Sequence, residues 1–439
     1  MDLAMLCNQC EMSAPGGCGS SGAEKGTCGK DSTLARLQDM MIYGLKGLAA
    51  YRSQAHQLGA DTSNVDKVTA ETLYFTLTNV NFDFDRHIKQ LMAVGTAGVE
   101  VMGLLADAHH NKLGVPTPVT VTQNKAEGKG ILVSGHDLKM LKELLEQTEG
   151  KGINVYTHSE MLPAHAYPEL KKFSHLKGNI GKAWFDQKAL FEKWQGAIVV
   201  NTNCIVIPRS DASYCDRLFT TSQVGVSQGK HIEGNDYSEV IKTALACDDI
   251  QGFDSEDTLT TGHNYKTILS LAPQILEAIN SGKITKFIVM AGCDAPGKGR
   301  DYYREMAKQL PETTVIITSS CGKFRFNDLD FGNVPGTEIP RYLDLGQCND
   351  SNGAVQIALA LSEATGIAVN DLPIAISLMW MEQKAVLILF ALLSLGIQNI
   401  YIGPKPPQFV NEAIFNFLVE NFNLHLISTV EEDLPKLIG

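Results

Sequence analysis

Ten cysteines stand out in this chain, and the first four are close enough in sequence to bind a single metal centre. They are Cys7, Cys10, Cys18 and Cys28, and they form the pattern C-x2-C-x7-C-x9-C within a glycine-rich segment. Glycine lets the backbone fold tightly, so four thiolates on such a segment can surround an iron–sulfur cluster. A structural zinc ion is the alternative, because C-x2-C also opens many zinc sites. The spacing favours the cluster and leaves zinc open.

Six further residues that can bind metal each follow a short apolar run that is typical of a β-strand. The runs are 131–133, 153–156, 197–200, 287–290, 315–318 and 342–345, and the residues that follow them are His136, Glu160, Cys204, Cys293, Cys321 and Cys348. Open α/β sheets place their ligand sites just beyond the carboxyl ends of the strands. One buried cysteine alone is more often a small core residue. Six metal-capable residues in the same topological position predict one shared site.

Other residues of the same types lack that position. Cys215 and Cys247 lie in helix-like segments, and we expect both to be structural. His109 and His110 are typical of a helix end, and His158 is expected to point away from its neighbour Glu160.

The secondary-structure elements that must position these residues divide the chain into a helical part and a part in which strands and helices alternate. Residues 31–113 are expected to be helical, with a first helix capped by Asp31 or Ser32 and further helical stretches at 71–77 and from 85 to about 94. From about residue 114, β-rich runs alternate with helical segments, which predicts parallel sheets covered by helices. The expected fold class is α/β: an N-terminal helical domain followed by two Rossmann-like parallel-sheet domains.

The length of 439 residues corresponds to about three typical domains. We expect a cluster loop and helical domain at 1–113 and α/β domains at 114–266 and 267–439, with the shared metal site between the domains. Neither a G-x-G-x-x-G motif after a strand nor a G-x-x-x-x-G-K-[ST] motif occurs, so the sequence gives nucleotide binding no support.

The composition is that of a globular protein, with 44% hydrophobic and 20% charged residues. A formal net charge of −12 argues against nucleic acid and against an anionic membrane surface as partners. The longest apolar run, 385–397, is too short to span a bilayer and predicts a buried helix. The N-terminus does not resemble a signal peptide. We therefore expect a cytoplasmic protein whose cysteines serve metal or redox chemistry rather than disulfides.

A set of short motifs resembles the hybrid cluster proteins, also called hydroxylamine reductases. The motifs are CNQCE at 7–11, TNVNFD at 78–83, SGHDLK at 134–139, YTHSEMLPA at 156–164, NTNC at 201–204, VMAGCD at 289–294, SSCGKFRFN at 319–327, LGQCNDS at 345–351 and WMEQKAV at 380–386. The resemblance covers most of the chain and is dense from Gly130 to the C-terminus. Such a set is far more specific than any single motif.

The resemblance implies a hybrid iron–sulfur–oxygen cluster of the [4Fe-2S-2O] type. It implies seven ligands: His136, Glu160, Cys204, Cys293, Cys321, Cys348 and Glu382. Glu382 comes from the resemblance alone, which also implies a persulfide on Cys293. The expected catalytic residues are Glu160, Glu382, His136 and Cys293, with Lys384 as a weaker proton donor that is more simply a solvated charge. The four N-terminal cysteines would bind a [4Fe-4S] cluster that relays electrons.

The activity that the resemblance implies is the reduction of small N–O compounds. Hydroxylamine would give ammonia and water, and reduction of nitric oxide to nitrous oxide is the competing activity. Thiolates suit irons bridged by sulfide, whereas imidazole and carboxylate suit a harder iron that binds oxygen. The electron donor would be an unidentified redox protein. The alternatives are a nitric oxide scavenger or redox sensor without turnover, and a carbon monoxide dehydrogenase-like enzyme, against which the two carboxylate ligands weigh.

The chain departs from the family pattern in two ways. The gap between Cys18 and Cys28 is longer than is usual, which leaves the type of the N-terminal cluster open. The chain is also shorter than the common members, with the missing part in the N-terminal helical region, and is similar to a short class from archaea and some thermophilic bacteria. Because that loss exposes surface near the relay cluster, we expect a homodimer with this region at the interface.

Overall fold

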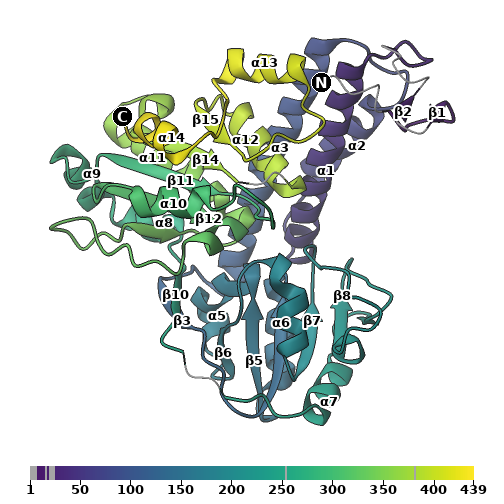
Figure 1. Ribbon diagram of the computed structural model, residues 1–439, viewed down its shortest axis with the longest axis vertical. Helices are drawn as coiled ribbons and strands as arrows, with labels where there is room; N and C mark the ends of the chain where they lie inside the picture. Colours follow the sequence, from purple (N-terminus) through teal and green to yellow (C-terminus); the bar gives the residue numbers. More distant parts are fainter. Residues whose placement is uncertain (1–6, 15–16, 19–24, 253–254, 380–381) are drawn as a thin grey trace. The chain divides into compact units, whose positions relative to one another are not determined.

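The computed structural model describes residues 7–14, 17–18, 25–252, 255–379 and 382–439 (Figure 1). The chain divides into two compact units. The first consists of Met1–Ala108 and Leu361–Leu437, and the second of His109–Ala360 with the last two residues. The expected domain boundaries at 113 and 266 stay predictions.

Helices dominate the first unit. Its elements are β1 (Ser13–Ala14), β2 (Gly17–Cys18), α1 (Ser32–Gln57), α2 (Ser63–Phe75), most of α3 (Phe84–Leu113), β14 (Ile374–Leu378), α12 (Gln383–Ser394), β15 (Ile400–Ile402), α13 (Glu412–Phe422), β16 (His425–Leu426) and α14 (Val430–Ile438). Asp31 caps α1 by accepting a hydrogen bond from the Leu34 amide at 2.8 Å, as expected. Strands β14, β15 and β16 are parallel.

Close helix packing holds the first unit together. Helix α12 is almost wholly buried, which confirms the buried helix expected near 385–397. Gly95 of α3 lies against α12, where an added Cβ would come within 2.1 Å of the Phe390 carbonyl oxygen. Helix α3 extends far beyond the expected end near residue 94, because its apolar periodicity continues through Val101 and Leu105. By length and composition α3 could cross a membrane, but 56% of its most apolar stretch is buried, as in the core helix of a globular protein.

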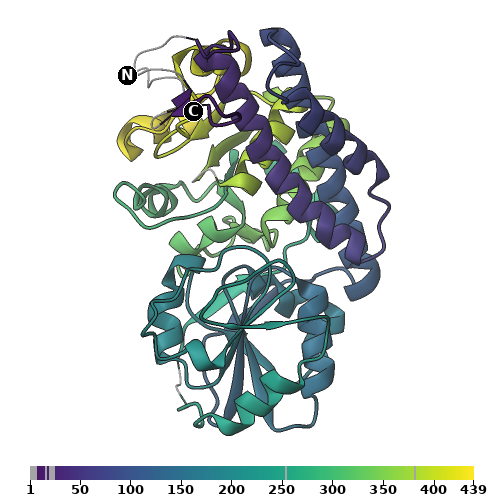
Figure 2. The ribbon, with the colours of Figure 1, turned by 90° about the vertical axis from the view of Figure 1, so that its right-hand side faces the viewer.

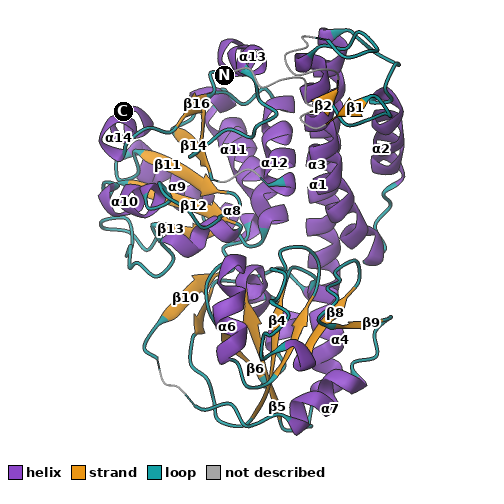
Figure 3. Ribbon diagram, turned by 45° about the vertical axis from the view of Figure 1, so that its right-hand side comes forward, coloured by secondary structure: helices purple, strands orange, loops and turns teal. Residues whose placement is uncertain are grey.

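The second unit contains a six-stranded parallel sheet in the order β6-β5-β4-β7-β8-β9 (Figures 2 and 3). Its strands are β4 (Lys129–Ser134), β5 (Ile153–His158), β6 (Leu176–Asn179), β7 (Ala197–Val200), β8 (Leu218–Thr221) and β9 (Lys230–Ile232). The helices around it are α4 (Leu138–Thr148), α5 (Pro168–Lys171), α6 (Gln187–Lys193) and α7 (Ser238–Ala246), with short 3-10 turns at η1 (Ser159–Ala166), η2 (Trp184–Asp186) and η3 (Cys215–Arg217).

Both faces of this sheet are buried, as parallel sheets require. On one face Ile131 and Val133 pack with the apolar side of α4, which includes Leu141 and Leu145. On the other face Leu132 packs in a separate cluster with aromatic residues of and near α6. This burial fixes the register of β4 and therefore the place where the strand ends.

The second unit also contains a further set of parallel strands. These are β11 (Lys286–Ala291), β12 (Thr314–Ser319) and β13 (Tyr342–Asp344), with β12 between the other two. They are accompanied by α8 (Tyr265–Ser270), α9 (Ala272–Asn280), α10 (Tyr302–Gln309), η4 (Cys321–Arg325), η5 (Cys348–Ser351) and the start of α11 (Asn352–Thr365). An antiparallel ribbon of β3 (Val119–Thr122) and β10 (Thr258–Thr261) completes the unit. The expected α/β fold with parallel sheets is confirmed.

Candidate metal centre

Three of the expected metal-binding residues follow three neighbouring strands. Strand β4 lies between β5 and β7, and the chain continues from these strands to His136, Glu160 and Cys204. The strand order reverses at β4, because β5 and β7 lie on its opposite sides. Such a switch point is where open parallel sheets form ligand sites.

His136, Glu160 and Cys348 come together in the second unit. One potential ligand atom of each lies within 4.8 Å of those of the other two, and all three residues are at least 97% buried. His136 Nε2 is 3.7 Å from Glu160 Oε2, which also accepts a hydrogen bond from the Cys348 amide at 2.9 Å. The structure thus joins an imidazole, a carboxylate and a thiol that come from distant parts of the sequence.

The imidazole of His136 is oriented by the loop that follows β7. Its Nδ1 is 2.9 Å from the Thr202 hydroxyl, and its backbone amide donates to Asn201 Oδ1 at 2.8 Å. With Nδ1 engaged, Nε2 faces Glu160, which is the arrangement expected of a metal-binding histidine with an outer partner. Gly135, with φ of +138°, is required before it, because an added Cβ would lie 1.9 Å from the Asn201 carbonyl oxygen.

Gln347 joins the loops that carry these three residues. Its side-chain amide donates to the carbonyl oxygens of His136 at 2.9 Å and Glu160 at 2.8 Å. Gln347 is fully buried, so each of these hydrogen bonds forms away from water. The residue before Cys348 therefore holds the backbones of the other two together.

Cys321 lies beside this group. Burial raises the pKa of the Cys321 thiol well above its usual range, and the nearby Glu160, Cys204 and Cys348 raise it further. The Ser159 hydroxyl is 3.5 Å from the Cys321 sulfur. If all of these groups were charged, they would repel one another. The positive charge of a bound metal centre relieves this repulsion and keeps the thiols that coordinate it deprotonated.

Backbone hydrogen bonds tie the other cysteine loops to that of Cys321. The Gly322 amide donates to the Gly292 carbonyl at 2.9 Å, next to Cys293, and the Ser320 amide donates to the Gly346 carbonyl at 3.2 Å. Cys204 and Cys293 are only partly buried and lie outside the tight group of three.

A buried ion pair also connects the loops after β12 and β13. Lys323, in η4, donates to both carboxylate oxygens of Asp344 at 2.8 and 2.9 Å and to the Gly346 carbonyl at 2.7 Å. Neither charged side chain is exposed to solvent. Lys323 follows Cys321 by two residues, so the pair fixes the loop of that cysteine against the loop that leads to Cys348.

Backbone strain is concentrated at the ends of these strands. Ser159, Thr202, Cys204 and Ser320 have positive φ values between 55° and 73°, and they make up four of the seven such non-glycine residues that the structure describes. Each either is an expected ligand or lies within two residues of one. Strained residues of this kind persist where the surrounding structure holds them, often at functional sites.

The remaining sequence candidates have different surroundings. Glu382 lies in the first unit, where its carboxylate caps α12 by accepting from the Lys384 amide at 3.1 Å. Lys384 is buried over the ring of Tyr51, so its interpretation as a solvated charge is wrong. Trp380 and Met381 of the WMEQKAV motif lie outside the described residues.

The N-terminal cysteines are also in the first unit. Cys7 and Cys18 are buried together against Ala35 of α1, whereas Cys10 is exposed and Cys28 is partly buried. The structure packs Cys7 and Cys18 together. Their role as ligands of one cluster stays a prediction.

The other cysteines and histidines fit structural roles. Cys215 begins η3 and Cys247 is the C-cap residue after α7. His109 and His110 lie in the last turns of α3, and His158 Nδ1 is 2.9 Å from the Ser134 hydroxyl rather than engaged with Glu160. The orienting residues Asn201, Thr202 and Gln347 are absent from the sequence-based candidates, although they lie within the NTNC and LGQC motifs.

The donor set fits an iron centre with mixed ligands. Thiol, imidazole and carboxylate groups converge in a buried place, and these types together suit iron that carries both sulfur and oxygen. A site of thiols alone would suit zinc or a conventional cluster equally well. The fold and this centre define an α/β protein with a buried, metal-capable site at its strand ends.

Comparison with known proteins gives the family. A model of the Prismane/CO dehydrogenase family matches residues 5–93 and 84–435. Proteins named hydroxylamine reductase from Thermotoga petrophila and Moorella thermoacetica are 47% and 48% identical to this chain, over 99% of it and 100% of each relative. The chain belongs to the Prismane/CO dehydrogenase family and, within it, to the hybrid cluster proteins, and is therefore an iron–sulfur oxidoreductase.

The chain has the length of a short class within the family. Alignment with the Thermotoga relative spans 437 positions, whereas alignment with a hydroxylamine reductase from Geobacter metallireducens, 40% identical and covered in full by both chains, spans 557. The family model matches this chain in two segments, and the segments overlap at residues 84–93, in the N-terminal helical region.

Solved structures of carbon monoxide dehydrogenases share the fold. The nickel-free enzyme from Thermococcus sp. AM4 has a TM-score of 0.79 at 16% identity, over 99% of this chain and 90% of that one. Carbon monoxide dehydrogenase IV from Carboxydothermus hydrogenoformans has a TM-score of 0.76, also at 16% identity, over 99% and 92%. At this identity the likeness concerns the fold alone.

Proposed function

We propose that this protein reduces small N–O compounds at a hybrid iron–sulfur–oxygen cluster held by His136, Glu160, Cys204, Cys293, Cys321, Cys348 and Glu382. In the main reaction hydroxylamine, two electrons and two protons give ammonia and water, and the N–O bond is broken. Nitric oxide, reduced to nitrous oxide, is the second substrate proposed. The observation that carries the proposal is the buried meeting of His136, Glu160 and Cys348. The names of the full-length relatives support it.

The bound cluster would supply electrons and a Lewis-acidic iron for the substrate oxygen. The protein supplies orientation and exclusion of water. The hydrogen bond between Thr202 and Nδ1 of His136 holds the imidazole in one direction, and Gln347 fixes the backbones of His136 and Glu160. Because the side chains are so well buried, polar interactions in the site are stronger than they would be in water.

Protons for the reaction must reach a buried place. Glu160 is the proposed proton carrier. Its Oε2 lies 3.7 Å from His136 Nε2, and its carboxylate can hold a proton between transfers. Glu382 and His136 are further proposed donors, and Cys293 is proposed to carry the extra sulfur of a persulfide.

Electrons would enter through a [4Fe-4S] cluster on Cys7, Cys10, Cys18 and Cys28, from a redox protein that remains to be identified. The burial of Cys7 and Cys18 against α1 supports this assignment. We also propose that the protein acts in the cytoplasm.

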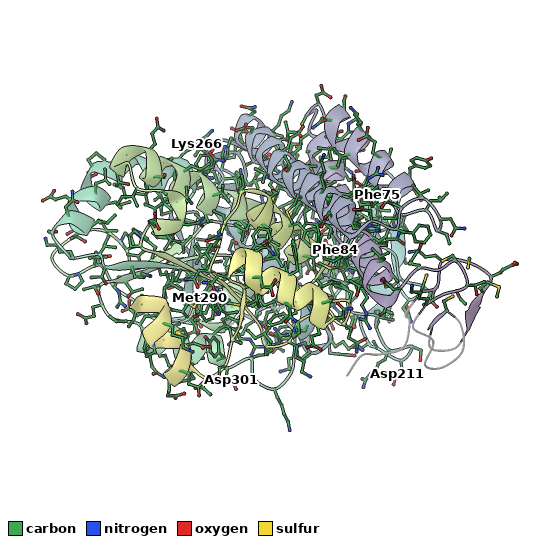
Figure 4. The ribbon with its side chains drawn as sticks, turned by 90° about the horizontal axis from the view of Figure 1, so that it is seen from above. Phe75, Phe84, Asp211, Lys266, Met290 and Asp301 are labelled. Carbon is green, nitrogen blue, oxygen red and sulfur yellow. The ribbon has the colours of Figure 1, made fainter. Side chains whose placement is uncertain are left out.

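An apolar surface supports the proposed homodimer. The side chains Leu73, Tyr74, Leu77, Val80 and Phe82 are exposed on and after α2. They lie around the connection between Phe75 and Phe84, both labelled in Figure 4, just before residues 84–93, where the two parts of the family match overlap. Contiguous exposed apolar side chains often mark an interface between proteins, and a second copy of the chain is the proposed occupant.

The test is turnover by protein purified without oxygen, with hydroxylamine and then with nitric oxide as substrate. The variant Glu160→Ala should lose most turnover while the signal of the N-terminal cluster in electron paramagnetic resonance remains. Retained activity in this variant would remove Glu160 from the site. Binding of nitric oxide without turnover of either substrate would favour a scavenger or sensor, and oxidation of carbon monoxide would favour the dehydrogenase alternative.

A further inference from the structure

The second unit contains a cavity of about 540 Å³ that the chemistry described above does not use. Its lining comes from the β3–β10 ribbon, from the loop after η4 and from β13. A volume of this size is within the range of small-molecule sites, about 300–1,000 Å³.

The ribbon separates this cavity from the candidate metal centre. Leu259 of β10 and Val121 of β3 pack in one cluster with Cys321. Thr258 and Thr260, on either side of Leu259 in the strand, line the cavity. Because alternate residues of a strand point to opposite faces, the cavity and Cys321 lie on opposite faces of the ribbon. The cavity is therefore separate from the candidate metal centre.

The charged side chains that line the cavity are acidic. They are Glu256, Asp257, Asp328 and Asp330, and none of the described lining residues is Lys or Arg. Asp328 is paired with Arg304, which lies outside the lining, at 2.6 Å. The other three carboxylates give the cavity a negative potential that attracts cations.

Aromatic rings form part of the same lining. Phe331 and Tyr342 are stacked, with ring centroids 5.7 Å apart and an angle of 7° between the ring planes. The faces of such rings attract organic cations, and carboxylates beside them add to this attraction. A cavity with both features suits an ammonium group better than a bare metal ion, which would require more tightly converging oxygens.

Three buried polar atoms of the lining side chains have no hydrogen-bond partner among the described residues. They are His263 Nδ1, Asn327 Nδ2 and Tyr342 Oη, and each residue is more than nine-tenths buried. Native proteins leave few buried polar atoms unsatisfied. Of these atoms, Tyr342 Oη and unprotonated His263 Nδ1 can accept a hydrogen bond from a cationic ligand, whereas Asn327 Nδ2 is itself a donor.

We propose that this cavity binds an aliphatic polyamine. Ammonium groups would pair with Glu256, Asp257 and Asp330, the methylene chain would lie against Phe331 and Tyr342, and one ammonium group would donate to Tyr342 Oη or to unprotonated His263 Nδ1. Several carboxylates in one cavity suit a ligand with more than one cationic centre. This inference does not depend on the reaction proposed for the metal centre.

The test is isothermal titration calorimetry of anaerobically purified holoprotein with spermidine. We expect saturable binding to one site per chain. The double variant Glu256→Gln/Asp330→Asn keeps the shape of both side chains and should weaken binding at least about tenfold, since it removes two charges. The variant Phe331→Leu should weaken it about threefold through loss of a ring.

The matched control removes two carboxylates elsewhere in the same unit. Asp211, labelled in Figure 4, and Glu233 are highly exposed and lie outside the cavity lining. Asp211→Asn/Glu233→Gln should change the affinity less than twofold. Equal weakening by the two double variants would show diffuse attraction to an acidic protein and overturn the proposal. So would the absence of saturable binding up to about 1 mM spermidine.

Discussion

The buried pair of Lys323 and Asp344 offers the sharpest test of how the cysteine loops are held. In Lys323→Met the methionine fills nearly the same volume, but three hydrogen bonds of 2.7–2.9 Å disappear. Asp344 then keeps the hydrogen bond from the Gly346 amide and remains a fully buried carboxylate that has lost its ion-pair partner Lys323. Breaking such a pair from one side costs about 3–5 kcal/mol.

We therefore expect the free energy of unfolding to fall by about 3–5 kcal/mol, measured by urea titration with circular dichroism under argon. The double variant Lys323→Met/Asp344→Leu should recover much of this loss, because it removes the uncompensated charge as well. Iron content should fall in the single variant, since the loops of Cys321 and Cys348 lose their connection.

The control is Lys230→Met, which breaks another lysine–carboxylate pair in the same unit. Lys230 and Glu239 are also 2.8 Å apart, but their side chains are 50% and 61% exposed. An exposed pair contributes about 0–1 kcal/mol, so this variant should be close to the parent protein. The reasoning is refuted if Lys323→Met loses no more stability than Lys230→Met.

Three further predictions address orientation, pH and assembly. Thr202→Val removes the hydroxyl that orients His136 and should lower turnover about 10–100-fold in a steady-state hydroxylamine assay; unchanged turnover would contradict that role. Burial lowers the pKa of His109 to about 3 and that of His165 to about 4, below their usual 6.5, so both are neutral when folded and gain a proton on unfolding. Their contribution to stability is complete above pH 6.5 and declines toward pH 4, by roughly 2 kcal/mol between pH 6 and pH 5. Urea titrations should show that His109→Asn/His165→Asn flattens this slope, and an identical slope would contradict the assignment. Light scattering should find a dimer that Tyr74→Glu converts to a monomer at micromolar concentration, and a monomeric parent protein would refute the interface.

Much of the second unit could be predicted from sequence because its central strands contain apolar, mostly β-branched runs that are almost wholly buried. Strands β4, β5 and β7 match the expected runs, and so the residues that follow them were found. The short outer strands β6, β8 and β9 escaped prediction, since runs of three or four residues with polar members resemble loops.

The supporting residues of the centre were harder to find from sequence. A lysine such as Lys323 resembles a surface residue, and it is buried only because Asp344, 21 positions later, approaches it in the fold. The roles of Asn201 and Gln347 likewise depend on hydrogen bonds over 65 and more positions. Glu382 was available only through the resemblance to a family, because nothing in its own sequence context marks it as a ligand.

The central claim is that the chain holds a conventional iron–sulfur cluster and a hybrid cluster. It is tested most directly by metal analysis of protein purified without oxygen. About eight irons per chain, with neither nickel nor zinc, is the expected result, since two four-iron clusters account for that number. Nickel beside iron would contradict the claim in favour of carbon monoxide chemistry, and zinc alone or only about four irons would contradict the presence of two clusters.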